Sequence, residues 1–166
     1  MTGLSVGDRL ALSDLVDRYA AHVDDRDFDS LGALFTDDAV LRQPRPPRRM
    51  EPTDDVRGRE SIVANFARLR DLRATQHAVV GRAFAAASGT APDAASPAGS
   101  AVTEATGRIA CIAHHVSGAD DRPVDHAWHL TYRDLYRRNG DAWLIAERTL
   151  QLHWIETRSV GAVRDR

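Results

Sequence analysis

The sequence predicts an α+β domain with three N-terminal helices packed against a strongly curved, mainly antiparallel sheet. Apolar residues recur with helical spacing in the first part of the chain, and from Ala74 onward the period changes to about two. A length of 166 residues with 43% hydrophobic content suits one globular domain. Because the helices precede a run of strands, we expect them on one face of a cone-shaped α+β barrel with a pocket between the layers.

Three helices are predicted in the first 70 residues. The firmest spans Asp8 to Val23, where one inward stripe contains Leu12, Leu15, Val16, Tyr19, Ala20 and Val23. A second, short helix is predicted from the apolar positions Phe28, Leu31, Leu34 and Phe35 and ends at residues 36–38. The third helix follows Gly58 and is defined by Ile62, Val63, Phe66 and Leu69.

The sheet is predicted to begin with a short strand at residues 39–41. Residues 43–55 contain four prolines and few apolar groups, which indicates an irregular loop. Four longer strands are expected near residues 75–87, 101–117, 124–138 and 142–156. Residues 88–100 read as a long flexible hairpin loop, whereas 117–122 and 138–142 read as short turns.

Composition excludes several classes of protein. The 22 basic and 24 acidic residues are scattered and nearly balanced, so neither nucleic acid nor a membrane surface is an expected partner. Every basic residue is arginine, which excludes a Schiff-base lysine, a pyridoxal-phosphate enzyme and a P-loop. The single cysteine, Cys111, has no internal disulfide partner, and no signal-like or 18-residue apolar segment is present. These features predict a soluble, cytoplasmic protein.

One imidazole lies inside an apolar strand. Alternation places His77, Val79, Gly81 and Ala83 on one face, where the small residues leave room either for a ligand or for a closely packed helix. By itself, such a histidine is more often structural than functional. Tyr19 and Asp24 are five residues apart, or about 140° around the helix axis, but Asp24 lies where the helix ends and can turn inward. On this pattern alone, Tyr19 fits a core residue and Asp24 fits a turn residue as well as either fits a functional site.

A metal site is not expected. The pairs His114/His115 and His126/His129 are each separated by an odd number of positions, so the members of a pair point to opposite faces of a strand. Zinc-protease, paired-cysteine, dinucleotide-binding and nucleophile-elbow motifs are all missing from the sequence. One of His114 and His115 must still face inward.

The ordered pattern resembles the SnoaL-like branch of the nuclear transport factor 2-like superfamily. It consists of YAAHVDDRDFDSL from residue 19, LFTDDA from 34, TQH from 75 and YRRNGDAWLIAER from 136. The similarity covers about residues 8–157 and is nearest to the scytalone dehydratase and bile acid 7α-dehydratase families. It implies catalytic roles for Tyr19, Asp24, His77 and His114, although His115 is an open alternative to His114. The pocket tyrosine and pocket asparagine of scytalone dehydratase fall near Gln43 and Tyr132, where this sequence has neither, which argues against the same substrate.

The resemblance implies a cofactor-independent dehydratase, isomerase or cyclase acting on a small hydrophobic cyclic substrate, such as a polyketide- or steroid-like ketone. His77 would remove a proton alpha to a carbonyl, Asp24 would orient it, and Tyr19, together with His114, would donate hydrogen bonds. The expected substrate contacts are Phe66, Gly81, Trp128 and Tyr132, although the strand side bearing Trp128 and Tyr132 could instead join subunits.

Two alternative functions remain open. One is a non-catalytic ligand-binding or assembly module, because this fold serves many functions. The other is an accessory small subunit of an aromatic-ring dioxygenase. In either case the resemblance implies a homo-oligomer, either a dimer or a trimer.

Overall fold

The computed structural model describes residues 3–87, 102–119 and 122–163, so the predicted loop at 88–100 and part of the turn at 117–122 lie outside the described residues. The chain runs through α1 (Val6–Asp25), α2 (Phe28–Gly32), β1 (Phe35–Arg45), β2 (Arg49–Arg57), α3 (Arg59–Phe66) and a 3₁₀ turn η1 (Ala67–Asp71), followed by β3 (Ala74–Ala86), β4 (Glu104–Ser117), β5 (Val124–Asn139) and β6 (Ala142–Ser159). The α+β class is therefore confirmed.

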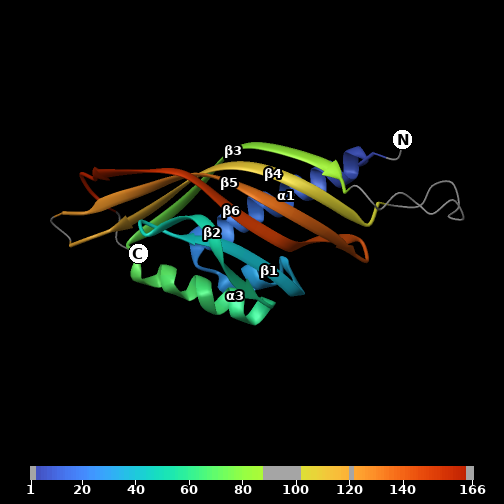
Figure 1. Cartoon of the computed structure of the whole chain (residues 1–166), viewed down its shortest axis with the longest axis horizontal. Coiled ribbons are helices and arrows are strands. Elements are labelled where there is room, and N and C mark those ends of the chain that lie inside the picture. The colour runs from blue at the N-terminus through green and yellow to red at the C-terminus, as the bar shows by residue number, and fades with distance from the viewer. Residues whose placement is uncertain (1–2, 88–101, 120–121, 164–166) are drawn as a thin grey trace, which may run out of the picture.

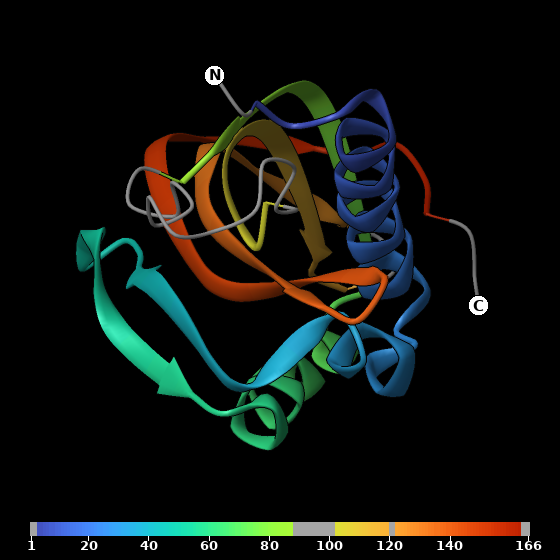
Figure 2. The ribbon, with the colours of Figure 1, turned by 90° about the vertical axis from the view of Figure 1, so that its right-hand side faces the viewer.

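The six strands form one sheet in the order β2-β1-β6-β5-β4-β3. Only the β1–β6 pair is parallel among the described strands, so the sheet is mixed but mainly antiparallel, as predicted. Helix α1 lies along the face of the long strands, and α3 lies beneath β1 and β2 (Figure 1). Viewed from the end, the long strands curve and α1 lies along one side of them (Figure 2).

Helix α1 begins and ends at well-defined caps. The Ser5 side chain accepts a hydrogen bond from the backbone N–H of Asp8 at 3.0 Å, and the Asp8 carboxylate accepts one from Ser5 N at 3.1 Å. The helix ends at Arg26, which adopts the left-handed conformation with φ 59°. The predicted inward stripe is buried along its whole length. This packing fixes the position of Asp24 in the last turn.

Two sequence-based assignments near the start of the sheet were wrong. Residues 43–55 were predicted to be an irregular loop, but 43–45 end strand β1 and 49–55 belong to strand β2. Phe35, predicted to be helical, begins β1. Strand β2 is the sheet edge and pairs only with β1, so Pro52 lies where a missing N–H is tolerated. Helix α2 stops at Gly32, and the Leu34 carbonyl accepts a hydrogen bond from Ile145 N in β6. Pairing across the sheet therefore overrides the local pattern.

Gly81 was predicted on the face of β3 that carries His77, but a β-bulge at Val80 turns it away from that face. Val79 pairs with Cys111 and Gly81 pairs with Ala110, so Val80 is the extra residue on β3. Beyond the bulge the alternation shifts by one position, and Arg82 rather than Gly81 pairs with the inward-facing Ile109. Gly81 is consequently exposed, away from the face that carries His77.

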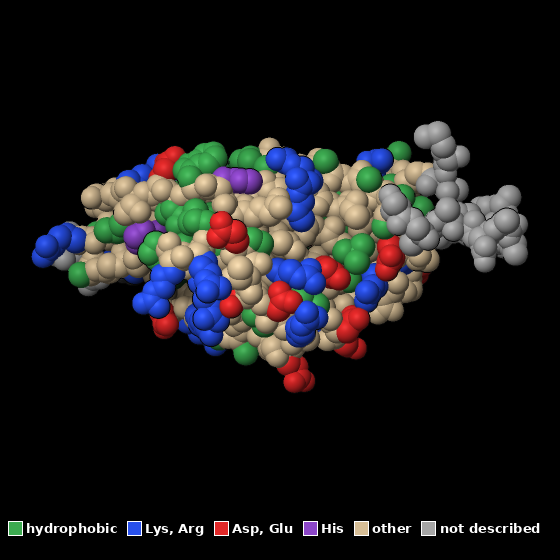
Figure 3. All heavy atoms as spheres, in the orientation of Figure 1, with side chains coloured by type: hydrophobic (Ala, Val, Ile, Leu, Met, Phe, Trp, Pro, Cys, Tyr) green, Lys and Arg blue, Asp and Glu red, His purple; other side chains and the backbone are tan. Residues whose placement is uncertain are grey.

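The surface shows no strong separation of charge at its centre. On the face in Figure 3, basic and acidic side chains are interspersed over the middle of the molecule. None of the helices within the described residues is long and apolar enough to cross a membrane.

Candidate active site

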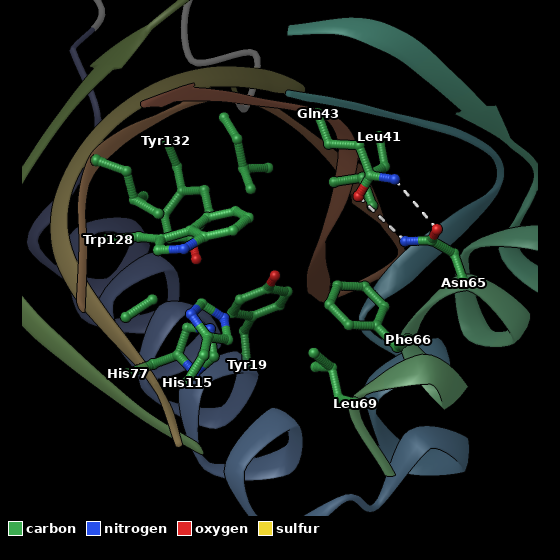
Figure 4. A pocket seen from close by; sticks show the side chains of 13 residues that line it. Tyr19, Leu41, Gln43, Asn65, Phe66, Leu69, His77, His115, Trp128 and Tyr132 are labelled. Atoms are coloured by element: carbon green, nitrogen blue, oxygen red, sulfur yellow. Dashed lines mark hydrogen bonds between the residues drawn. The ribbon is translucent and has the colours of Figure 1, made fainter. Parts of the chain in front are cut away.

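A small pocket opens between the sheet and the helices, with a volume of about 120 Å³. Its walls come from both helical segments and strands, which converge on one space (Figure 4). The lining is mostly apolar, with a few polar groups facing inward, as is usual for a small-molecule site. The lining residues are Tyr19, Leu41, Gln43, Asn65, Phe66, Leu69, His77, Ala113, His115, Trp128, Leu130, Tyr132 and Leu150.

Asp24 and His77 form a hydrogen-bonded pair at the pocket wall. The Nδ1 atom of His77 lies 2.7 Å from Oδ1 of Asp24, and the backbone N–H of His77 donates to Oδ2 at 2.7 Å. The His77 side chain is 6% exposed and that of Asp24 is 22% exposed. The carboxylate therefore fixes both the backbone and the ring of His77, although 53 residues separate them in the chain.

The topology explains how one carboxylate reaches two groups. Strand β3 is the second edge of the sheet, so its outward backbone N–H groups have no partner strand. The end of α1 lies beside this edge and brings Asp24 to the N–H of His77. Burial raises the pKa of Asp24, but the hydrogen bonds from His77 outweigh that effect, and the net pKa is lowered. Asp24 is therefore an anion at neutral pH and must accept the proton on Nδ1.

Tyr19 forms the floor of the pocket, and its hydroxyl points inward (Figure 4). Its ring packs edge-on against Phe66, His77 and Tyr132, with centroids 6.1, 6.4 and 5.8 Å away. Burial raises the pKa of Tyr19, and the positive charge of Arg148 offsets only part of that effect. The phenol is therefore protonated and able to donate a hydrogen bond.

Arg148 supports the two tyrosines from inside the core. Its guanidinium carbon lies 3.9 Å from the ring centroid of Tyr19 and 4.3 Å from that of Tyr132. Two hydrogen bonds, of 2.9 and 2.7 Å, join the fully buried guanidinium to Asp134. Burial would lower the pKa of Arg148, but the Asp134 carboxylate outweighs burial and raises it well above its ordinary value. Sequence reasoning missed this arginine, because a strand position gives no local signal of such burial.

His115, rather than His114, faces the pocket. The His115 ring packs edge-on against His77 with centroids 6.0 Å apart, and its Nδ1 lies 3.3 Å from the carbonyl oxygen of His126. Burial, followed by the neighbouring His77, lowers the pKa of His115 to about 4. His115 is thus neutral at neutral pH. With Nδ1 donating to the carbonyl, its Nε2 is left as an acceptor.

His114, which the resemblance suggested for the site with His115 as the open alternative, lies outside the pocket. Ala113 and His115 both line the pocket, and side chains alternate along a strand, so His114 projects from the other face of β4. There its Nδ1 lies 2.7 Å from Oδ2 of Asp125. This second pair resembles Asp24–His77 in geometry but borders a different, open cleft.

Two polar lining residues were not among the predicted site residues: Gln43 of β1, which the resemblance had placed near a pocket position, and Asn65 of α3. The amides of Gln43 and Asn65 exchange two hydrogen bonds of 3.1 Å across the pocket rim (Figure 4). Gln43 was predicted in a loop. Asn65 lies three positions after Ile62 on the predicted helix, so the shared face was a usable signal.

The structure brings most of the predicted site residues together. Five of them line the pocket: Tyr19, Phe66, His77, Trp128 and Tyr132. Asp24 is hydrogen-bonded to the ring of His77 and does not itself line the pocket. Gly81 and His114 lie elsewhere. Among residues 3–87, 102–119 and 122–163, no three His, Cys, Asp or Glu side chains are grouped so that they could hold a metal ion. The pocket thus brings the carboxylate-bonded imidazole of His77 and the phenol of Tyr19 to one space.

The chain belongs to the SnoaL-like domain family, whose sequence profile matches residues 5–149. This match confirms the family predicted from the ordered sequence pattern. A comparison with curated proteins found no match.

Solved structures share the fold at low sequence identity. A protein from Novosphingobium aromaticivorans, provisionally assigned as a scytalone dehydratase, is 20% identical, with 96% of this chain and 93% of that chain covered and a TM-score of 0.71. A type 2 hexachlorocyclohexane dehydrochlorinase, LinA, is 14% identical, with 97% and 95% covered and a TM-score of 0.70. ActVI-ORFA from Streptomyces coelicolor is 18% identical, with 89% and 98% covered and a TM-score of 0.65. At these identities the likeness shows the fold alone.

Proposed function

We propose that this protein is a cofactor-independent lyase or isomerase that removes a proton alpha to a carbonyl group in a small hydrophobic cyclic substrate. The observation that carries the proposal is the Asp24–His77 pair, with Nδ1 and Oδ1 2.7 Å apart, at the wall of an apolar pocket. An imidazole oriented by a carboxylate at the wall of such a pocket supports a role in proton transfer.

His77 acts as the general base. The Asp24 carboxylate accepts the Nδ1 proton and thereby leaves Nε2 with its lone pair available to the substrate. The negative charge of Asp24 also stabilises the imidazolium that forms when Nε2 takes the alpha proton. Asp24 is a positioning residue in this scheme, because its oxygens contact His77 and not the substrate.

Tyr19 stabilises the charge that develops on the substrate. Removal of the alpha proton moves an electron pair onto the carbonyl oxygen, and a protonated phenol in a low-dielectric pocket is a suitable donor to that oxygen. The raised pKa of Tyr19 keeps its proton in place. The Gln43–Asn65 amide pair offers a second polar contact to a substrate at the rim.

Elimination completes the dehydratase form of the reaction. The enolate expels a hydroxyl from the beta carbon, the C–O bond breaks, and the proton held on His77 Nε2 leaves with that oxygen as water. His115, neutral and with Nε2 free to accept, can hold the hydroxyl before it departs. Return of the proton to another carbon instead gives isomerisation. The names of the dehydratase and dehydrochlorinase among the similar structures support elimination chemistry for this fold.

The test is proton exchange and dehydration of a β-hydroxycyclohexanone probe. Deuterium incorporation at the alpha carbon is followed by NMR in deuterium oxide, and cyclohexenone formation is followed by its ultraviolet absorbance. We expect His77→Ala and Asp24→Asn each to lower the exchange rate by about 100-fold or more, as loss of a positioned general base does.

His114→Ala is the matched control, because His114 also pairs with an aspartate at 2.7 Å but faces away from the pocket. Its exchange rate should stay within about twofold of the wild type. Exchange without elimination would identify an isomerase or cyclase. Equal rates in wild type, His77→Ala and Asp24→Asn would refute proton abstraction by this pair and leave a ligand-binding module.

A further inference from the structure

A second apolar cavity adjoins the pocket and is not used by the proposed reaction. Its volume is about 660 Å³, more than five times the 120 Å³ of the pocket itself. We call it the outer groove; it is lined by Pro46, Pro47, Arg68, Leu69, Leu72, His115, His126, Trp128, Ile155 and Thr157. Leu69, His115 and Trp128 border both spaces. The two spaces are therefore neighbours that share part of their lining.

The two volumes set the size of each part of a ligand. An apolar cavity of about 150 Å³ in another protein accommodates one benzene molecule, so the pocket beside His77, at about 120 Å³, has room for no more than about one ring. Sites for larger organic molecules usually measure about 300–1,000 Å³, which is the range of the outer groove. The reacting ring thus fits inside, while the larger part of the molecule lies outside.

The walls of the outer groove indicate the chemistry of that larger part. Leu72, Ile155 and Trp128 give it an apolar surface, whereas Arg68 supplies a positive charge at the rim. Arg68 is exposed, and within the residues that the structure describes it has no ion pair or hydrogen bond. His126, the other polar ring there, is already engaged, with Nδ1 3.2 Å from Oγ1 of Thr157.

In Figure 3, basic side chains gather beside an apolar area toward the left end of the molecule, near the tip of the β1–β2 hairpin. An unpaired guanidinium beside an apolar wall suits an anionic group at the end of an apolar chain.

We propose that the substrate has two parts: a cyclic ketone that enters the pocket, and an apolar chain with a carboxylate end that lies in the outer groove against Arg68. This inference rests on the proposed function for the identity of the ring, but its evidence lies in the groove. In this scheme Arg68 and Ile155 contact the chain and its charged end and not the reacting atoms. They therefore determine which substrate binds and take no part in the reaction itself.

Three probes separate the contributions of ring, chain and charge. They are cyclohexanone, an octanoic acid carrying an oxocyclohexyl ring at its far end, and the methyl ester of that acid. Dissociation constants come from titrations followed by proton–nitrogen correlation NMR, in which the shifted backbone amides also locate the ligand. We expect the ester to bind about tenfold or more tightly than cyclohexanone, because part of the chain becomes buried. The acid should bind about two- to fivefold more tightly than the ester at low salt.

Two variants assign these gains to residues. Arg68→Gln should reduce the affinity for the acid to that for the ester and leave the ester unchanged. Arg70→Gln is the matched control, because Arg70 lies in the same 3₁₀ turn and lines a different cavity. Ile155→Trp, which fills the outer groove, should remove the gain from the chain while cyclohexanone still binds. Thermal unfolding of each variant verifies that it is folded.

The proposal is overturned if the three probes bind equally, or if the chain shifts amides away from Leu72 and Ile155. Loss of affinity for cyclohexanone in Arg68→Gln would also contradict it. These outcomes are independent of turnover: the exchange assay with His77→Ala tests the proposed reaction, whereas the probe titrations test only where the remainder of the substrate binds.

Discussion

Replacing Asp134 with asparagine should destabilise the protein more than any exposed charge replacement. The side chains of Arg148 and Asp134 are both 0% exposed, and Tyr136 adds a hydrogen bond to the carboxylate at 2.5 Å. The asparagine side chain would keep the volume and one acceptor oxygen but leave the guanidinium charge uncompensated in the core. Breaking a buried pair in this way costs about 3–5 kcal/mol. Because the total stability of a domain is about 5–15 kcal/mol, this loss is a large fraction of it.

The assay is urea unfolding at neutral pH, followed by circular dichroism. With a urea dependence of about 2 kcal/mol per molar, the Asp134→Asn midpoint should fall by about 1.5–2.5 M. Asp14→Asn is the control: it removes an exposed ion pair to Arg18, and its cost should be about 0.5 kcal/mol or less. A loss below about 1 kcal/mol for Asp134→Asn would refute the view that this pair holds a charge inside the core.

Three further predictions follow from buried groups. Burial lowers the pKa of His115 from its ordinary 6.5 to about 4 in the folded protein, so between these pH values the unfolded chain binds more protons. The free energy of unfolding of the wild type should therefore fall as the pH drops from 6.5 to 4. This fall should exceed that of His115→Phe by up to about 3 kcal/mol. An identical pH slope in both would contradict this. Burial raises the pKa of Cys111 to about 12, so iodoacetamide should modify it in urea and not in the native protein, as mass spectrometry can measure. Gly107→Ala places a Cβ 2.7 Å from Tyr136 Cε2 and should lower the free energy of unfolding by about 1–3 kcal/mol, whereas an unchanged urea midpoint would show that the ring moves aside at no cost.

The spacing of apolar residues predicted the helix and strands that bury one face. The apolar stripe of α1 and the alternation of β4, β5 and β6 are determined by burial of one face, and both were predictable. Strand β2 was not, because an edge strand accepts prolines and forms through pairing with β1. The side of the sheet predicted for Gly81 was wrong for a related reason. The extra residue at Val80 moves every later side chain of β3 to the opposite face, and the local sequence does not indicate such a bulge.

A site residue was predictable from the sequence where the apolar pattern of its own helix or strand shows which way it faces. Tyr19 lies on the buried stripe, and the family pattern supplied the link between Asp24 and His77 that alternation alone could not. Counting along β4 left His114 and His115 open, since only the pairing register decides which of them faces in. Arg148 was invisible to sequence reasoning because its burial depends on Asp134, a partner on another strand.

The most direct test of the Asp24–His77 base is nitrogen NMR of histidine-labelled protein near neutral pH, with the His77 signals assigned through the His77→Ala spectrum. A carboxylate 2.7 Å from Nδ1 predicts that the neutral imidazole of His77 carries its proton on Nδ1 and not on Nε2. Asp24→Asn should remove this tautomer preference, and His114→Ala should leave it intact. A wild-type His77 protonated on Nε2 would contradict the assignment, because that nitrogen would have no lone pair with which to take a proton from the substrate.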